Sequence, residues 1–254
     1  MSFTDSNTIF VKQYGMMRSG TNYTQWLIDN FKNTFALANA PQWKHGNPNI
    51  SNASFKSIED DRFKDAYIKK ISLAKRQSIS HFAQKAWDDD KMRFLVTAKH
   101  PYSWYLSWLR SYRLLEETRI GLCSQPKVVI KRKELKFTDK HLAACAKWYC
   151  DSYRVWLDYI DGLDLGTFVR YEDLLQDPTS GLKKIKTELE LPHLKGDLKL
   201  FPPRIDPGGV VTNNKIDRKL YNMKNVFGQF TPRQHRIFEE GLDMDVIARL
   251  GYKW

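Results

Sequence analysis

Short apolar runs alternate with longer amphipathic stretches along this chain. The runs have the length of buried strands and cover residues 8–14, 34–39, 92–98 and 167–174. Between them, apolar residues recur every three or four positions, which predicts helices at residues 24–31, 62–87, 101–115, 139–160 and 181–189. Strands that alternate with helices are typical of a mainly parallel sheet with helices on its faces. We therefore expect one α/β domain that spans residues 1–254.

A loop bounded by two glycines joins the first predicted strand to the first predicted helix. It runs Gly15-Met-Met-Arg-Ser-Gly20. A loop between a strand and a helix can aim its backbone N–H groups and the helix N-terminus at an anion. The loop is thus a candidate anion site, and the alternative is an ordinary strand-to-helix turn.

The residues around Gly20 differ from those of a nucleotide-kinase loop. A kinase loop needs Lys and then Ser or Thr directly after the second glycine, to reach the outer phosphates and to hold magnesium. Here Thr21 and Asn22 follow Gly20, and the cation is Arg18, inside Arg-Ser-Gly-Thr. This sequence resembles the phosphosulfate-binding loop of the PAPS-dependent sulfotransferases, where PAPS is 3′-phosphoadenosine 5′-phosphosulfate.

The resemblance implies a P-loop-like sulfotransferase fold, PAPS as the sulfonate donor and no requirement for a metal. It also assigns roles to the loop. Arg18 would counter the charge that develops on oxygen as the S–O bond breaks, and Tyr23 occupies the position of the family's adenine-stacking aromatic residue. The residues that would hold the donor here are Arg18, Ser19, Gly20, Thr21, Asn22 and Tyr23.

A second motif follows the predicted strand at 92–98. Lys99 comes directly after the strand, Pro101 opens a helix and Ser107 lies eight positions after Lys99. This is similar to the 3′-phosphate motif of the same family, which has Arg-x-Pro and then a Ser eight residues after the Arg. Lys in place of Arg keeps the positive charge but loses the bidentate geometry. The resemblance implies that Lys99 and Ser107 bind the 3′-phosphate.

Later segments extend the resemblance. Arg170-Tyr-Glu-Asp-Leu174 is similar to a sulfotransferase core segment in which the Tyr approaches the adenine, which implies that role for Tyr171. Arg218 and Lys219 are the nearest match to an Arg-Lys-Gly loop that closes on the 3′-phosphate in the cytosolic branch, although the Gly is missing. The end of the chain, residues 246–252, also looks like the family's C-terminus.

Two histidines are candidates for the base that would take a proton from the acceptor. His45 follows Lys44 after the predicted strand at 34–39, and a neighbouring cation favours the neutral imidazole. In open α/β sheets ligands bind at strand ends, which favours His45. His81 is the alternative, because the family's catalytic His precedes the strand that enters the 3′-phosphate motif.

Charge and composition restrict the class of protein. The formal net charge is +12, which implies attraction to anions such as nucleic acid, an acidic glycan or a polyanionic cofactor. No zinc-finger, RNA-binding or basic-zipper pattern accompanies it, so we do not expect a nucleic-acid partner. The N-terminus is polar, no run of eighteen apolar residues occurs, and the three cysteines have no metal-ligand spacing. We expect a cytoplasmic protein with reduced thiols and no membrane association.

The sequence therefore predicts a PAPS-dependent sulfotransferase. Its acceptor would be a hydroxyl or amine of an unidentified small molecule or glycan, and residues 47–91 and 116–140 could be insertions that form the acceptor site. Two alternatives remain: a kinase or phosphotransferase that uses ATP with magnesium, and a non-catalytic basic protein that binds polyanions. The oligomeric state is not readable from the sequence.

Overall fold

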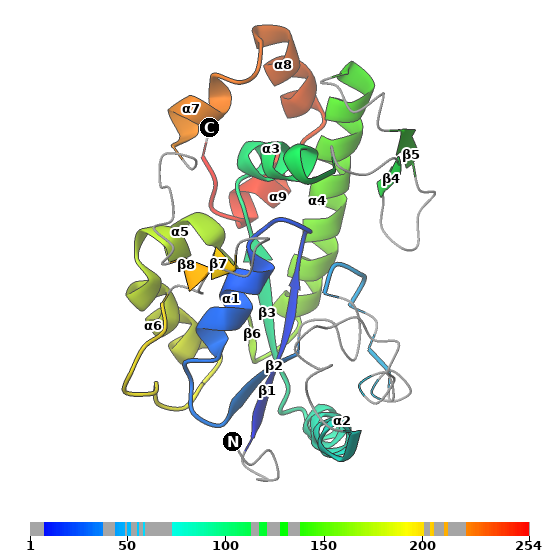
Figure 1. Ribbon diagram of the computed structural model, residues 1–254. Coiled ribbons are helices and arrows are strands. Elements are labelled where there is room, and N and C mark those ends of the chain that lie inside the picture. Colours follow the sequence, from blue (N-terminus) through cyan, green and yellow to red (C-terminus); the bar gives the residue numbers. More distant parts are fainter. Residues whose placement is uncertain are drawn as a thin grey trace.

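A parallel sheet forms the centre of the protein (Figure 1). The computed structural model describes residues 8–37, 44–48, 50–51, 55, 58, 73–112, 117–120, 128–131, 138–200, 204–205, 211–212 and 222–253. Within them the sheet has four strands, all parallel, in the order β2-β1-β3-β6: β1 is Ile9–Gly15, β2 is Thr34–Leu37, β3 is Arg93–Ala98 and β6 is Gly166–Arg170. The expected α/β class with a parallel sheet is confirmed.

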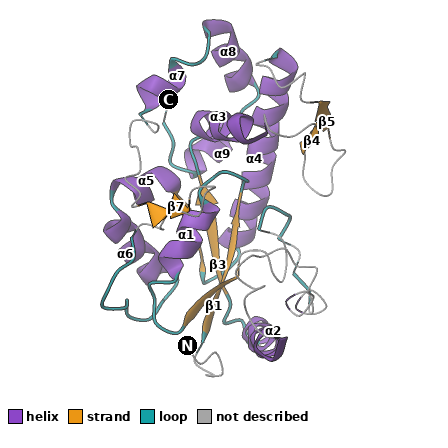
Figure 2. Ribbon diagram, viewed as in Figure 1, coloured by secondary structure: helices purple, strands orange, loops and turns teal. Residues whose placement is uncertain are grey.

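Helices cover both faces of this sheet (Figure 2). The alternation of side chains along β1 decides which residues meet the helices of each face. Val11 belongs to a core with α1 (Thr21–Ile28), α5 (Tyr171–Gln176) and α6 (Pro178–Glu188). Phe10 and Tyr14 belong to a larger core on the other face, which is rich in aromatic rings. The helices of that second face are α2 (Leu73–Asp88), α3 (Pro101–Tyr112), α4 (Asp139–Asp161), α8 (Pro232–Glu240) and α9 (Met244–Arg249).

Most predicted elements are present with shifted ends. The first helix begins three residues earlier than expected, at Thr21, directly after Gly20. The predicted helix at 181–189 begins at Pro178, where Asp177 caps it by accepting a hydrogen bond from the N–H of Ser180. The predicted helices at 62–87 and 101–115 extend into residues outside the described ranges, and their described parts are α2 and α3.

One prediction is wrong. The strand expected to run through residues 167–174 ends at Arg170, and α5 begins at the next residue, Tyr171, without an intervening turn. Glu172 and Asp173 explain this, because acidic residues in the first turn stabilise a helix N-terminus. Tyr171 and Glu172 therefore lie at a helix start at the end of the sheet.

The remaining described elements lie around this framework. Two short antiparallel pairs join β4 (Glu117–Ile120) to β5 (Val128–Lys131) and β7 (Arg204–Ile205) to β8 (Val211–Thr212). Helix α7 (Met223–Phe227) precedes α8. Among the helices described here, none combines the length and the hydropathy needed to cross a membrane.

Candidate functional site

The order of the strands indicates where a ligand would bind. From β1 the chain passes to β2 on one side and then returns to β3 on the other side. In open parallel sheets, ligands bind beyond the carboxyl ends of the two strands at which the connections change direction. Here those strands are β1, which leads into the loop 16–20, and β3, which leads into Lys99.

The loop after β1 is held in an unusual backbone conformation. Arg18 and Gly20 have φ values of 70° and 93°, in the left-handed region that most residues avoid. Ser19 is buried and fixes the loop from inside, because both its N–H and its hydroxyl donate to the Met16 carbonyl, at 3.1 and 2.7 Å. The Trp104 indole donates to the Met17 carbonyl at 2.8 Å. The loop is thereby shaped before any ligand arrives, and the Arg18 side chain is exposed.

The N-terminus of α1 opens toward this loop. Its N-cap is Gly20, no side chain caps it, and its first turn contains no acidic residue. The first N–H groups of a helix lack partners within the helix and carry a partial positive charge. Thr21 begins the helix, with its methyl group packed against Gly15, and Gln13 donates to the Thr21 carbonyl at 2.8 Å. The arrangement has the form of an anion cradle.

A short segment from another part of the chain completes the end of β1. The N–H of Gly15 donates to the carbonyl of Lys44 at 3.0 Å, and the Trp156 indole donates to the carbonyl of Gly46 at 2.9 Å. Lys44 is buried, and its ammonium donates to Oδ1 of Asn22 at 2.5 Å. A lysine thus reaches the first turn of α1, the region where a kinase loop has its own lysine, but it comes from residue 44.

His45 is fixed by the same segment. Its Nδ1 is hydrogen-bonded to the carbonyl oxygen of Gly15, so Nδ1 carries the proton and the basic lone pair lies on Nε2. Burial lowers the pKa of His45 to about 4, and the positive charges of Lys44 and Lys12 act in the same direction, against the Gly15 hydrogen bond. The imidazole is therefore neutral at pH 7 and can accept a proton.

Lys99 brings a further cation to the carboxyl end of β3. The side chain is only 2% exposed, and its ammonium lies 5.2 Å from the centre of the Tyr171 ring. The same ring lies against Gly20, where an added Cβ would approach Tyr171 Cδ2 to 2.1 Å. Tyr171 therefore touches both the β1 loop and the Lys99 side chain. Arg18, Lys44 and Lys99 thus bring cations to this end of the sheet, and Lys12 of β1 is close enough to act on His45.

The other predicted site residues have different positions. Tyr23 is buried, donates to the Leu174 carbonyl at 3.4 Å and packs edge-on against Tyr171, so we do not propose it further as an adenine platform. Ser107 is partly buried in α3, and Ser103 lies four positions earlier on the same helix. Arg218 and Lys219 lie outside the described residues.

His81 is not brought to the cradle. It is exposed on α2, and this helix lies near the amino end of β1, opposite the loop (Figure 1). Of the two segments expected as insertions, 47–91 and 116–140, the structure describes α2, β4, β5 and a few further residues. Their role in acceptor binding stays a prediction. No group of His, Cys, Asp and Glu side chains suited to a metal ion occurs within the described ranges.

Sequence reasoning missed two features of the site. It noted Lys44 only as a cation beside His45, whereas the structure bonds Lys44 to the first turn of α1. It also considered Glu172 and Asp173 only as caps for the next helix, whereas the Glu172 carboxylate accepts the N–H of His100 at 3.0 Å. Each contact joins residues far apart in the chain, so local spacing held no signal for either.

Comparisons with known proteins found similar chains among solved structures only. No family model and no curated protein matches the sequence. The sulfotransferase domain from the curacin biosynthetic pathway is 14% identical, with a TM-score of 0.45, over 97% of this chain and 98% of that one. Mouse sulfotransferase SULT7A1, complexed with PAP, is 15% identical, with a TM-score of 0.46, over 93% of this chain and 83% of its own. The sulfotransferase domain of the Synechococcus PCC 7002 olefin synthase is 12% identical, with a TM-score of 0.42, over 98% and 96% of the two chains.

Proposed function

We propose that this protein is a PAPS-dependent sulfotransferase. The observation that carries the proposal is the joint geometry of two strand ends: the uncapped N-terminus of α1 behind the loop 15–20, and the buried Lys99 at the end of the neighbouring strand. A donor with a phosphosulfate at one end and a phosphate at the other needs two anion sites of this kind. Both lie where ligands bind in open parallel sheets.

Different cations of the chain would bind the two anionic ends of the donor. Arg18, Lys44 and the first N–H groups of α1 would surround the phosphosulfate, while Lys99 and Ser107 would hold the 3′-phosphate. The backbone groups and the buried Lys44 are fixed before the donor arrives. Preorganised donors of this kind stabilise charge that develops in a transition state without a cost of reorganisation.

His45 would act as the base. The acceptor oxygen or nitrogen attacks sulfur, and the bond between sulfur and the bridging oxygen of the 5′-phosphate breaks. Adenosine 3′,5′-bisphosphate leaves, and the acceptor's proton passes to Nε2 of His45. Because Nδ1 is bonded to the Gly15 carbonyl, the ring is held in the tautomer that this transfer requires.

Calorimetric titration with adenosine 3′,5′-bisphosphate, without magnesium, tests the proposal. We expect one site per chain, and we expect Lys99→Ala to weaken binding roughly 10- to 100-fold, the usual worth of a charged hydrogen bond to phosphate. Lys91→Ala is the matched control. Lys91 lies just before β3, at the opposite end of the strand from Lys99, and is exposed.

A parallel titration with ATP and magnesium decides between this proposal and a kinase. Binding of ATP without binding of the bisphosphate would overturn the proposal in favour of phosphoryl transfer. Binding of both with equal loss in Lys91→Ala and Lys99→Ala, and with a steep decline in salt, would indicate general attraction to polyanions.

A further inference from the structure

The C-terminal segment Gly251–Tyr252 lies against the junction between β6 and α5. The hydroxyl of Tyr252 donates to Oε2 of Glu172 at 2.9 Å, and Nη1 of Arg170 donates to the carbonyl of Gly251 at 2.6 Å. The Arg170 guanidinium also lies over the Tyr252 ring, 5.6 Å from its centre. Two residues of the junction, Arg170 and Glu172, thus hold the consecutive residues Gly251 and Tyr252.

Glu172 also contacts the turn after β3. Its other oxygen, Oε1, accepts the N–H of His100 at 3.0 Å, and Tyr149 donates to the carbonyl of Lys99 at 2.7 Å. These two groups belong to one peptide unit, the one that joins Lys99 to His100. A peptide unit is planar, so holding its C=O on one side and its N–H on the other fixes the backbone angle next to Lys99.

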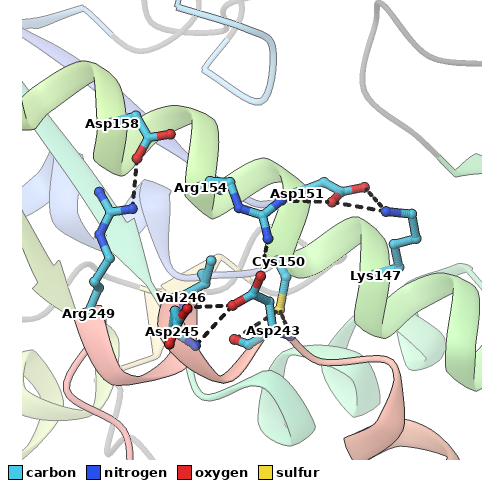
Figure 3. A network of polar contacts seen from close by, with 9 residues as sticks. All are labelled: Lys147, Cys150, Asp151, Arg154, Asp158, Asp243, Asp245, Val246 and Arg249. Atoms are coloured by element: carbon cyan, nitrogen blue, oxygen red, sulfur yellow. Dashed lines mark hydrogen bonds and ion pairs between the residues drawn. The ribbon is translucent and has the colours of Figure 1, made fainter.

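Helix α9, which precedes Gly251 and Tyr252 in the chain, is anchored on α4 (Figure 3). Asp243 caps α9, accepting the N–H groups of Asp245 and Val246 at 2.9 and 3.2 Å, and it also pairs with Arg154 of α4. Arg249 pairs with Asp158 and Asp161, at 2.7 and 2.8 Å. The place of Tyr252 is therefore set by the docking of α9 and not by Glu172 alone.

The charge of Glu172 gives the contact a second effect. Burial raises the pKa of Glu172, whereas the His100 N–H, the Tyr252 hydroxyl and the positive charge of Lys99 all favour its carboxylate form. Without the hydroxyl, Oε2 of Glu172 would lose its neutral donor. A carboxylate in a partly buried place that loses a donor draws the nearest cation more strongly.

We propose that Tyr252 and Glu172 are positioning residues for Lys99. The C-terminal segment holds the peptide unit after Lys99 and satisfies Glu172, so that the ammonium stays available to a bound anion. The inference rests on the proposed function in one respect: the anion bound by Lys99 is taken to be the 3′-phosphate of the donor.

Tyr252→Phe tests the proposal, because it keeps the ring and removes only the hydroxyl. We expect this variant to bind adenosine 3′,5′-bisphosphate roughly 5- to 20-fold more weakly than the parent protein, less than the full worth of a hydrogen bond to a charged group, because the hydroxyl acts on the anion only through Lys99. Tyr159→Phe is the matched control. The Tyr159 hydroxyl is buried without a hydrogen-bond partner in the described structure, so its removal is expected to leave binding unchanged.

A second measurement does not depend on the ligand. Hydrogen exchange at the His100 amide reports the Glu172 contact directly, and Pro101 has no amide hydrogen to confuse a short peptide that covers the turn. We expect exchange at His100 to rise at least tenfold in Tyr252→Phe and to stay unchanged in Tyr159→Phe.

The double variant Glu172→Gln with Tyr252→Phe separates the charge from the packing. Glu172→Gln removes the attraction to Lys99. The Tyr252→Phe substitution should therefore weaken bisphosphate binding less in this background than in the parent protein. Equal bisphosphate affinity in the parent protein and in Tyr252→Phe would overturn the proposal, as would unchanged exchange at His100. Failure of the parent protein itself to bind the bisphosphate would contradict the proposed function instead, and the exchange measurement would still decide whether Tyr252 holds the turn.

Discussion

His45 illustrates how single contacts set the chemistry of a residue. Its hydrogen bond to Gly15 selects the tautomer, and burial together with the nearby lysines lowers the pKa to about 4. A neutral imidazole at pH 7 is available as a base at any moment, although a lower pKa also makes it a weaker one. The expectation that Lys44 favours the neutral form agrees with the direction of this shift.

Under the proposed function, Arg18 is the residue at which anion binding and stability conflict. Its φ of 70° costs roughly 1–2 kcal/mol for a residue with a side chain. We expect Arg18→Gly to raise the free energy of unfolding by about 0.5–1 kcal/mol, since glycine relieves the strain but loses more entropy on folding. The same variant should bind the bisphosphate roughly 10- to 100-fold more weakly. Urea denaturation and calorimetry measure the two effects.

Glu190→Gly is the control for this prediction. Glu190 has a φ of 48° and follows α6, with an exposed side chain. It should show the gain in stability with no loss of binding. A loss of stability in Arg18→Gly would mean that the arginine side chain supports the loop by more than the strain costs.

At the scale of elements, the junction of β6 with α5 is the feature on which the site depends. Tyr171 lies against Gly20 of the β1 loop and beside Lys99, directly after β3, while Glu172 holds the turn that follows β3. Because no turn separates β6 from α5, both side chains are placed by the sheet itself. β6 thereby fixes the relative positions of β1 and β3, the strands that lead into Arg18 and Lys99.

We expect Gly20→Ala to disturb this junction strongly. A Cβ at Gly20 would come within 2.1 Å of the Tyr171 ring, and φ is 93°, so both space and backbone oppose a side chain. The predicted loss is about 2 kcal/mol or more in the free energy of unfolding, measured by urea denaturation. Adding Tyr171→Ala should recover part of the loss.

Gly162→Ala serves as the comparison for that measurement. Gly162 ends α4, and a Cβ there would lie 3.6 Å from the Tyr159 carbonyl, an ordinary contact. Its effect should be close to zero. Equal losses at Gly20 and Gly162 would show that Tyr171 does not restrict the loop.

The sequence predicted the elements of this site better than the contacts between them. The strand, the glycine-bounded loop and the following helix were readable because their pattern lies within one short stretch, residues 8 to 31. The position of His45 at the end of β1 depends on Gly15, thirty positions away, and the change from strand to helix at Tyr171 overrides the apolar pattern there. Local periodicity cannot report contacts of this range, because they form only when the sheet assembles.

For the whole molecule, two neutral histidines predict how stability depends on pH. Burial lowers the pKa of both His45 and His100 to about 4, from an ordinary value of 6.5. Between these values the unfolded chain binds protons that the folded chain does not, so stability falls as the pH falls from about 6.5 to about 4. Asp29 opposes this, because burial raises its pKa to about 6 and the folded state then takes up its proton first.

Comparison of variants isolates the histidine contribution. The difference in unfolding free energy between pH 7 and pH 5 should be smaller in His100→Asn than in the parent protein, by up to about 1.4 kcal/mol for each pH unit. His81→Asn, at an exposed position on α2, should follow the parent protein. An unaltered pH dependence in His100→Asn would show that this imidazole is not held neutral.

The contact between Tyr252 and Glu172 also bears on the order in which the molecule matures. The two residues are 80 positions apart, so translation supplies Tyr252 well after Glu172 and the other residues of the site. A nascent chain can present the Arg18 loop and the β3 turn long before the segment that holds that turn has emerged. If Lys99 binds the donor as proposed, a nascent chain that has not yet reached Tyr252 would bind the nucleotide more weakly than the folded protein.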